Sequence, residues 1–269
     1  MGRTSIMLWS VLKSFIGFTR NFKTVAEAKV DRFVRVGQKI SIDERDGAVF
    51  VVVYSAGLEV DEKRVIKSSA RVSIAFDLLD TDGNVFKYGA IDGDVDSSAA
   101  VQAAVNHVNR FSVPAGRKVY IEGVAVKDYT YIRNEGRILL VSGAGDWACA
   151  LTNSDKVNGN KGVTINNTGG VLDGNRQGQT GDISQLFGYF RNCVDFDVFG
   201  GVFTNNYAPE IEPTEHPDGP FLDGVAYGEG ESKYPTVGFI SYMGGRNNSN
   251  HDFVLIDWAQ EGISTRWNE

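Results

Sequence analysis

The chain has 269 residues, of which 42% are hydrophobic and 23% are charged. This composition predicts a folded chain with a buried core and excludes a disordered tail. Its 34 acidic and 27 basic side chains give a net charge of −7, which disfavours nucleic-acid binding because phosphate contacts need clustered positive charge. The 31 glycines argue against a helix bundle and for repeated tight turns in a β-rich chain.

The first stretch of the chain, residues 1–21, contains the apolar run Ile6–Phe18. A basic residue before this run and the small-residue pattern Ala26–Ala28 after it are features of a secretory signal peptide, which stays an alternative. Lys13 interrupts the run, however, and a membrane span needs about 20 consecutive apolar residues. We therefore expect an amphipathic segment used for attachment or assembly, with neither a signal peptide nor a membrane span.

Residues 22–79 are expected to form a small α+β module. A capping-box pattern at Thr24 predicts a helix that runs to about Phe33. The module also contains two strand patterns and a hairpin dipeptide between them. The strands are expected at Lys39–Ile42 and Val49–Tyr54, and the dipeptide is Asp46–Gly47.

Residues 80–269 begin with turn residues and a second helix pattern. Asp96 or Ser97 is the expected N-cap of a helix over 97–109, because apolar residues follow at helical spacing. Beyond this helix almost no helical period remains, and short β patterns recur instead. The expected strands are Lys118–Ile121, Arg137–Val141, Gly162–Asn166, Val194–Phe199, Val237–Tyr242 and Phe253–Ile256.

Two of the later segments repeat each other. Val163–Val171 lines up with Val194–Val202 at a fixed offset of 31 residues, which is typical of a solenoid. Asparagines also concentrate in this part, with thirteen in residues 153–269 and five before them. Stacked asparagines can form hydrogen-bond ladders, so repeated corners between short parallel strands account for both the glycines and the asparagines.

The segment Tyr88–Val105, which reads YGAIDGDVDSSAAVQAAV, resembles the opening of the pectate-lyase-like right-handed parallel β-helix family. In that family a Phe-Gly-Ala strand, an acidic turn and an Ala-rich helix cap the first coil. Val113–Ile121 is similar to the turn and strand that follow, and Gly170–Asn175 to a recurrent coil. The resemblance implies a mainly β fold, with a right-handed single-stranded parallel β-helix over residues 80–269 after the α+β module.

Phe22–Glu27 together with Val36–Ile40 resembles a short module that bacteriophage tailspikes carry between the virion anchor and the β-helix. That resemblance implies a homotrimer on the virion tail, which contacts tail or adaptor proteins and recognises a bacterial surface polysaccharide. One alternative is a polysaccharide depolymerase, either a glycoside hydrolase or a lyase. Another is a secreted bacterial enzyme of the same superfamily, which requires a cleaved signal at the N-terminus. The sequence lacks the motifs of the polygalacturonase branch.

The interruption between coils at residues 207–233 is the main candidate site, because it holds seven acidic residues and one lysine. Asp218 and Asp223 each precede a glycine and are the candidate catalytic carboxylates. Five further side chains are expected to bind the substrate: Tyr207, Phe221, Tyr227, Glu210 and Glu212. A solvated acidic loop or a trimer contact is the alternative interpretation.

A second candidate pair, Asp195 and Asp197, alternates with apolar residues, which predicts both carboxylates on one face of a strand. They would act as acid and base, or form an outward solvated row. Asp173 is expected to make a turn hydrogen bond.

His107 is expected to be structural. His251 has a neighbouring aspartate but no evident third ligand, so we expect no metal and no other cofactor.

Overall fold

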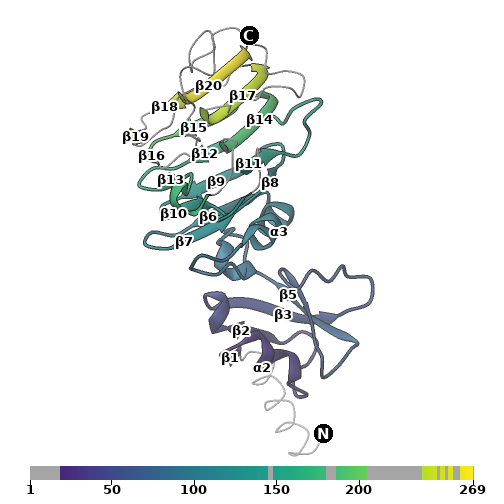
Figure 1. Cartoon of the computed structure of the whole chain (residues 1–269). Coiled ribbons are helices and arrows are strands. Elements are labelled where there is room, and N and C mark those ends of the chain that lie inside the picture. Colours follow the sequence, from purple (N-terminus) through teal and green to yellow (C-terminus); the bar gives the residue numbers. More distant parts are fainter. Residues whose placement is uncertain are drawn as a thin grey trace, which may run out of the picture.

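The computed structural model describes residues 19–144, 148–179, 186–204, 238–246, 249–251, 254–256 and 261–268. Within these ranges the chain forms one small sheet near its N-terminus and three further sheets that form the sides of a column, along which their strands stack (Figure 1). None of the helices in these ranges has the length and apolar character that crossing a membrane requires.

The N-terminal sheet holds five strands in the order β1-β2-β3-β5-β4. They are β1 (Arg20–Phe22), β2 (Lys39–Ile42), β3 (Ala48–Tyr54), β4 (Val65–Lys67) and β5 (Ile74–Leu78). β1 and β2 pair in parallel, and the other neighbours pair antiparallel. Both expected strands and the hairpin are confirmed. Asp46 and Gly47 have positive φ values of 56° and 68°, which such a dipeptide adopts readily.

One short helix, α2 (Val25–Val30), belongs to this module. Thr24 is its N-cap as predicted, and its Oγ1 accepts a backbone N–H at 3.1 Å. The prediction that the helix runs to Phe33 is wrong. Asp31 explains the early end, because its Oδ1 accepts hydrogen bonds from the backbone N–H groups of Phe33 and Val34 and holds the chain in a turn.

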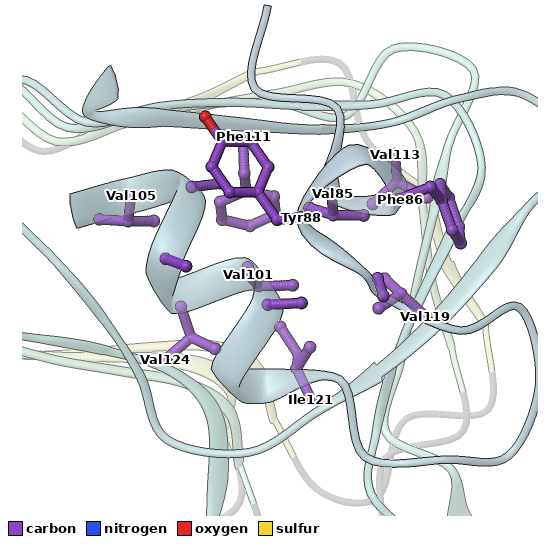
Figure 2. Packing of buried hydrophobic residues seen from close by; sticks show 14 of the residues in the cluster. Val85, Phe86, Tyr88, Val101, Val105, Phe111, Val113, Val119, Ile121 and Val124 are labelled. Atoms are coloured by element: carbon purple, nitrogen blue, oxygen red, sulfur yellow. The ribbon is translucent and has the colours of Figure 1, made fainter. Parts of the chain in front are cut away.

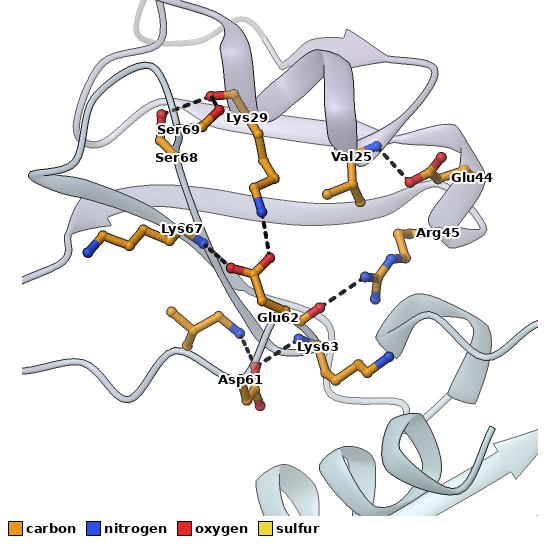
Figure 3. A network of polar contacts seen from close by, with 11 residues as sticks. Val25, Lys29, Glu44, Arg45, Asp61, Glu62, Lys63, Lys67, Ser68 and Ser69 are labelled. Carbon is orange, nitrogen blue, oxygen red and sulfur yellow. Dashed lines mark hydrogen bonds and ion pairs between the residues drawn. The ribbon is translucent and has the colours of Figure 1, made fainter. Parts of the chain in front are cut away.

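Polar contacts around Glu62 tie α2 to the loop before β4 (Figure 3). The Glu62 carboxylate accepts the Lys29 ammonium at 2.9 Å and the Lys67 backbone N–H at 3.4 Å. The Glu62 carbonyl accepts a hydrogen bond from the Arg45 guanidinium at 3.1 Å. Exposed ion pairs contribute little stability one by one, so the network chiefly fixes the loop's geometry.

The helix α3 (Ser98–Val108) confirms the helix expected over 97–109. Ser97 is its N-cap, and the C-cap Asn109 adopts the left-handed conformation with a φ of 52°. The Ser97 hydroxyl does not cap the helix itself. Asp96 takes that role, since its Oδ1 accepts the Ser98 N–H at 2.8 Å.

The strand that the family resemblance implied at Tyr88–Ala90 does not form. The chain instead makes the 3₁₀-helix η2 (Val85–Tyr88), which ends at Gly89 with a φ of 89°. The Asn84 side chain caps this helix by accepting the Phe86 N–H at 3.1 Å, which favours a helical turn over an extended strand.

Three parallel sheets follow α3. The β6 sheet holds β6 (Arg110–Val113), β9 (Tyr131–Asn134), β12 (Thr164–Asn166), β15 (Asp197–Phe199) and β18 (Ser249–His251). The β7 sheet holds β7 (Lys118–Ile121), β10 (Arg137–Leu140), β13 (Val171–Asp173), β16 (Val202–Thr204) and β19 (Val254–Ile256). The β8 sheet holds β8 (Val124–Val126), β11 (Cys149–Asn153), β14 (Leu186–Val194), β17 (Gly238–Arg246) and β20 (Glu261–Asn268). Because each coil adds one strand to each sheet, the column is a parallel β-helix.

Buried side chains fill the base of the column, where α3 covers the first coil (Figure 2). Val101 and Val105 of α3 and Tyr88 of η2 are completely buried there, as is Val119 of β7. Burial of an aliphatic side chain of this size contributes about 1.5–3 kcal/mol. The helix thus shields an end of the solenoid that would otherwise expose its core.

Successive coils differ in length at the corner between the β6 sheet and the β7 sheet. β13 pairs with β16 at an offset of 31 residues, as the sequence repeat predicts. β12 pairs with β15 at an offset of 33, so the predicted alignment of Val163 with Val194 is wrong by two residues. The corner between β12 and β13 has four residues, whereas that between β15 and β16 is the dipeptide Gly200–Gly201. This corner is two residues shorter, which accounts for the difference between the offsets of 33 and 31 residues.

Buried asparagines stack at this same corner. The Asn134 amide donates to Asn167 Oδ1 at 2.7 Å and to the Val171 carbonyl at 3.0 Å. Both asparagines are fully buried. The Asn167 amide donates to the Gly200 carbonyl of the next coil at 3.4 Å. The asparagine ladder suggested by the sequence is thus present and ends on backbone.

Polar contacts also join the N-terminal module to the capped coil. The Asn84 amide donates to Asp46 Oδ2 at 2.7 Å. Arg117 forms ion pairs with Asp46 at 3.5 Å and with Asp92 at 2.6 Å. The Arg117 guanidinium also lies over the Phe86 ring, 3.7 Å from its centroid. We call these five residues the neck.

Candidate functional site

The main candidate loop, residues 207–233, lies outside the described residues. The same therefore applies to all its predicted site residues: Tyr207, Glu210, Glu212, Asp218, Phe221, Asp223 and Tyr227. Strand register still gives the length of the coil that contains them. Asp197 pairs with Ser249, 52 positions along the chain, whereas Thr164 pairs with Asp197 after 33. The coil that holds 207–233 is therefore the longer of the two.

The second candidate pair lies in two different elements. β14 ends at Val194, and Asp195 has a φ of 54°, which turns the chain before β15 begins at Asp197. The predicted single strand over Val194–Phe199 is therefore wrong, because one left-handed residue suffices for a corner. Asp195 is a corner residue, and Asp197 is half-buried at the start of β15. Their catalytic roles stay predictions.

Asp197 belongs to an outward-facing surface of the β6 sheet. The inward residues Phe111, Ile132, Ile165 and Val198 are buried at one register position. The residues on either side of them point outward and form two rows across the strands. The first row is Arg110, Tyr131, Thr164 and Asp197, and the second is Ser112, Arg133, Asn166 and Phe199. We call these eight residues the outer β6 face.

The outer β6 face carries one aromatic side chain in each row, among polar side chains. Tyr131 is 40% exposed and Phe199 is 38% exposed. The Asn166 amide donates to the Tyr131 hydroxyl at 3.2 Å, and its own oxygen accepts a backbone N–H at 3.1 Å, which holds the amide in place. Arg133 forms an ion pair with Glu135, and this hydrogen bonding raises the pKa of Arg133. The face thus presents aromatic rings, an amide and charged groups on neighbouring strands about 4.8 Å apart.

The outer surface of the β7 sheet is closed by comparison. Tyr120, Leu139, Asp173 and Thr204 occupy its central row, and all are less than 9% exposed. The Asp173 carboxylate forms an ion pair with Arg137 at 2.7 Å. It also accepts a backbone N–H two residues on at 2.7 Å, which confirms the predicted turn hydrogen bond. This face is structural.

His107 and His251 lie in separate elements, α3 and β18. His107 Nδ1 is hydrogen-bonded to the Tyr88 hydroxyl at 2.8 Å, in keeping with a structural role. His251 lies in β18, and Asp252 is outside the described residues. Across the residues the structure describes, no three His, Cys, Asp or Glu side chains are grouped so as to hold a metal ion.

The sequence carries a signal for the outer β6 face, although Asp197 is the one predicted site residue among its eight residues. The triplets Tyr131–Arg133, Thr164–Asn166 and Asp197–Phe199 each place one β-branched residue between two residues that face outward. Aligning them on the central Ile or Val finds both rows. The triplets cannot be aligned from the Gly-Gly-Val repeat alone, because they are two residues further apart than that repeat. The strand register is needed to align them.

No family model and no curated protein matches the sequence. Among solved structures, the chain is similar to the enzymatically active domain of tailspike protein 2 from bacteriophage CBA120. The TM-score is 0.46, with 14% identity over 95% of this chain and 39% of that one. It is also similar to full-length tailspike protein 2 from an Escherichia coli O157:H7 bacteriophage. There the TM-score is 0.42, with 14% identity over 94% and 35% of the two chains.

A third similar structure is WceF of Pantoea stewartii, a glycan biofilm modifying enzyme with a bacteriophage tailspike-like parallel β-helix fold. Its TM-score is 0.44, with 11% identity over 94% of this chain and 42% of that one. The chain thus spans about two fifths of the length of these structures. Since every TM-score is below 0.5, the likeness transfers no substrate, assembly or activity, and the β-helix rests on its own strand pairing.

Proposed function

We propose that the chain is a phage tailspike, or its proximal part, that recognises a bacterial surface polysaccharide through the outer β6 face during host adsorption. One observation carries this proposal: two exposed aromatic rings share a rigid sheet surface with amide, guanidinium and carboxylate groups. An aromatic ring can pack on the apolar side of a sugar ring while polar groups bond to its hydroxyls. A rigid scaffold limits the entropy lost on binding.

A binding assay on host polysaccharides tests the proposal. We expect purified capsular and lipopolysaccharide glycans from candidate hosts to include one that binds the wild-type protein in isothermal titration calorimetry. Tyr131→Ala and Phe199→Ala should each weaken that binding about tenfold or more, which corresponds to about 1.4 kcal/mol. Tyr54→Ala and Phe33→Ala are matched controls, because both rings are exposed in the N-terminal module. Equal affinity of all four variants would contradict the proposal.

Assembly is a separate part of the proposal. As a tailspike, the chain forms a homotrimer, contacts tail or adaptor proteins and resides on the virion. Light scattering on the purified chain should give three times the monomer mass of 29.4 kDa. A monomer mass would count against the trimer. If the chain is instead a secreted enzyme, sequencing its mature N-terminus would show cleavage near Ala28.

A second candidate function is a polysaccharide depolymerase, either hydrolase or lyase. The observation that favours it is the half-buried Asp197 carboxylate in the same row as Tyr131. Asp197 and Asp195 are the proposed acid and base at this surface, and Asp218 and Asp223 are the other candidate pair of catalytic carboxylates. Asp197→Asn should abolish release of reducing ends or of unsaturated uronates while binding persists. A glycan that binds but is never cleaved would reject this candidate.

A further inference from the structure

A polar cleft lies beside the outer β6 face, where strands of the β8 sheet turn into strands of the β6 sheet. It is a shallow, open hollow with a volume of about 620 Å³. Three segments line it: the last turn of α3 with the residue after it, the corner between β8 and β9, and the first part of the corner between β11 and β12. We call it the corner cleft.

The corner cleft exists because successive corners differ in length. The corner from β8 to β9 has four residues, and the one from β11 to β12 has ten. Asn160 of the longer corner is almost fully buried and links the two. Its amide donates to Asp128 Oδ1 at 3.1 Å and to Ser154 Oγ at 3.2 Å. The Asn109 amide donates to the Asp128 carbonyl at 2.6 Å, so the wall of the cleft is fixed before any ligand arrives.

Several polar atoms that line the corner cleft are unused by the fold. Asp128 Oδ1 accepts the Asn160 amide and the Lys161 N–H, while Oδ2 has no partner within the described residues. The Asn158 amide donates to Asp155, which leaves the Asn158 side-chain oxygen as an acceptor. The Nδ1 atom of His107 is hydrogen-bonded to Tyr88, and no hydrogen bond to its Nε2 is formed by the described residues. The cleft therefore offers acceptors and a ring nitrogen.

The charge balance of the corner cleft argues against an ion as its ligand. Asp155 also lines the cleft, but both of its oxygens already accept hydrogen bonds from residues 157 and 158. These bonds, led by the Asn158 backbone N–H, lower the pKa of Asp155. Among the described residues, Lys127 is the one lysine or arginine that lines the same cleft as Asp128. A site with one available carboxylate, one ammonium and several amides suits a neutral molecule rich in hydroxyls.

We propose that the corner cleft binds a neutral sugar residue, as a subsite separate from the outer β6 face. The inference rests on the proposed function, because the sugar would be an end or branch of the same glycan. Chain geometry supports the continuity: Asp128 stands three residues before Tyr131, and Lys161 three before Thr164, so both segments lead directly onto the first row of the outer β6 face.

Saturation-transfer NMR with neutral methyl glycosides tests the inference without knowledge of the whole glycan. The probes are the methyl glycosides of glucose, galactose, mannose, rhamnose and N-acetylglucosamine. At least one should bind the wild-type protein, and Asp128→Asn and Asn158→Ala should each weaken it about tenfold. Asp128→Asn keeps an oxygen for the Lys161 N–H. Should it fail to fold, Asn158→Ala decides alone, because Asn158 is exposed. Asp43→Asn, an exposed aspartate of the N-terminal module, is the control.

The outcomes separate this inference from the proposed function. If no glycoside binds, or if binding is equal in Asp128→Asn, Asn158→Ala and wild type, the corner cleft is not a sugar site. If the polysaccharide binds and responds to Tyr131→Ala but not to either cleft variant, the proposed function stands and the inference is overturned. If a glycoside binds and responds to both cleft variants but not to Tyr131→Ala, a separate subsite is supported. Failure of every polysaccharide to bind then counts against the proposed function alone.

Discussion

At the residue scale, buried amides and glycines shape the corners of the β-helix. Asn134 and Asn167 satisfy each other and the backbone of neighbouring coils where water has no access. A buried amide without a partner is costly, so such a ladder is stabilising only as a complete set. Gly201 complements it, because its lack of a side chain leaves room for the Asn167 amide.

Asn134→Ala should destabilise the fold by about 1–3 kcal/mol, because the buried Asn167 oxygen and the Val171 carbonyl lose their donor. Urea unfolding followed by circular dichroism measures the change. Asn166→Ala is the matched control, since Asn166 is only partly buried and lies on the outer β6 face. If both variants lost the same stability, the ladder would have no special role.

Gly201→Ala should lower the melting temperature more than Gly169→Ala. The two glycines have φ values of 81° and 84°, so alanine suffers the same left-handed backbone penalty of roughly 1–2 kcal/mol at each. A Cβ at position 201 would also overlap the Asn167 amide and carbonyl, whereas nothing lies within 4 Å of one at position 169. The difference between the melting temperatures of the two variants measures the steric overlap at position 201, because the backbone penalty is common to both. Equal melting temperatures would refute it.

At the element scale, α3 links the N-terminal part to the first coil. Its Gln102 exchanges two hydrogen bonds with the backbone of Ala125 in β8, at 2.8 and 3.1 Å. Its His107 meets the Tyr88 hydroxyl of η2. Burial, and next the positive charge of Arg64, lower the pKa of His107 from its ordinary 6.5, while Asp77 and Asp61 act in the opposite direction.

Stability should therefore fall as the pH drops below about 6.5, through the lower pKa that His107 has in the folded protein. The unfolded chain takes up the proton first, so the contribution of neutral His107 is complete above that range and lost beneath it. Melting temperatures between pH 7 and pH 5 measure the effect. His107→Gln should show a smaller drop than the wild type, and parallel curves for the two proteins would contradict the assignment.

Short sequence patterns correctly predicted those elements that are determined by residues close together in the chain. The cap at Thr24, the hairpin dipeptide at Asp46–Gly47 and the apolar period of α3 are examples. The corner at Asp195 was missed because one aspartate in a left-handed conformation leaves the polar–apolar alternation unchanged. Apart from Asp197, the outer β6 face was missed because it joins residues about 33 positions apart, and only the strand register brings them together.

At the scale of the whole molecule, the neck connects two different architectures. The antiparallel part of the N-terminal sheet and the parallel column meet where Arg117 binds Asp46, Asp92 and the Phe86 ring. The two ion pairs are partly exposed and modest alone, whereas the Phe86 ring is buried. Together they restrict how the N-terminal module turns against the column.

Arg117→Met should loosen the neck while leaving both architectures folded. We expect a stability loss of about 1 kcal/mol and faster hydrogen exchange over residues 79–92, because two ion pairs and a cation–π contact are removed together. Hydrogen–deuterium exchange mass spectrometry measures this. Arg133→Met removes an exposed ion pair away from the neck and serves as control. Unchanged exchange over residues 79–92 would show that Arg117 does not restrain the joint.

The unequal corners have a consequence for the insertions and deletions that such a chain can tolerate during evolution. Strands that pair with their neighbours and point apolar residues inward keep their alignment whether the corner after them has two residues or four. An insertion or deletion at a corner therefore stays where it occurs and does not disturb the next coil. The corners are therefore the positions of this scaffold that tolerate changes in length. A new peptide can be grafted at a corner for the same reason.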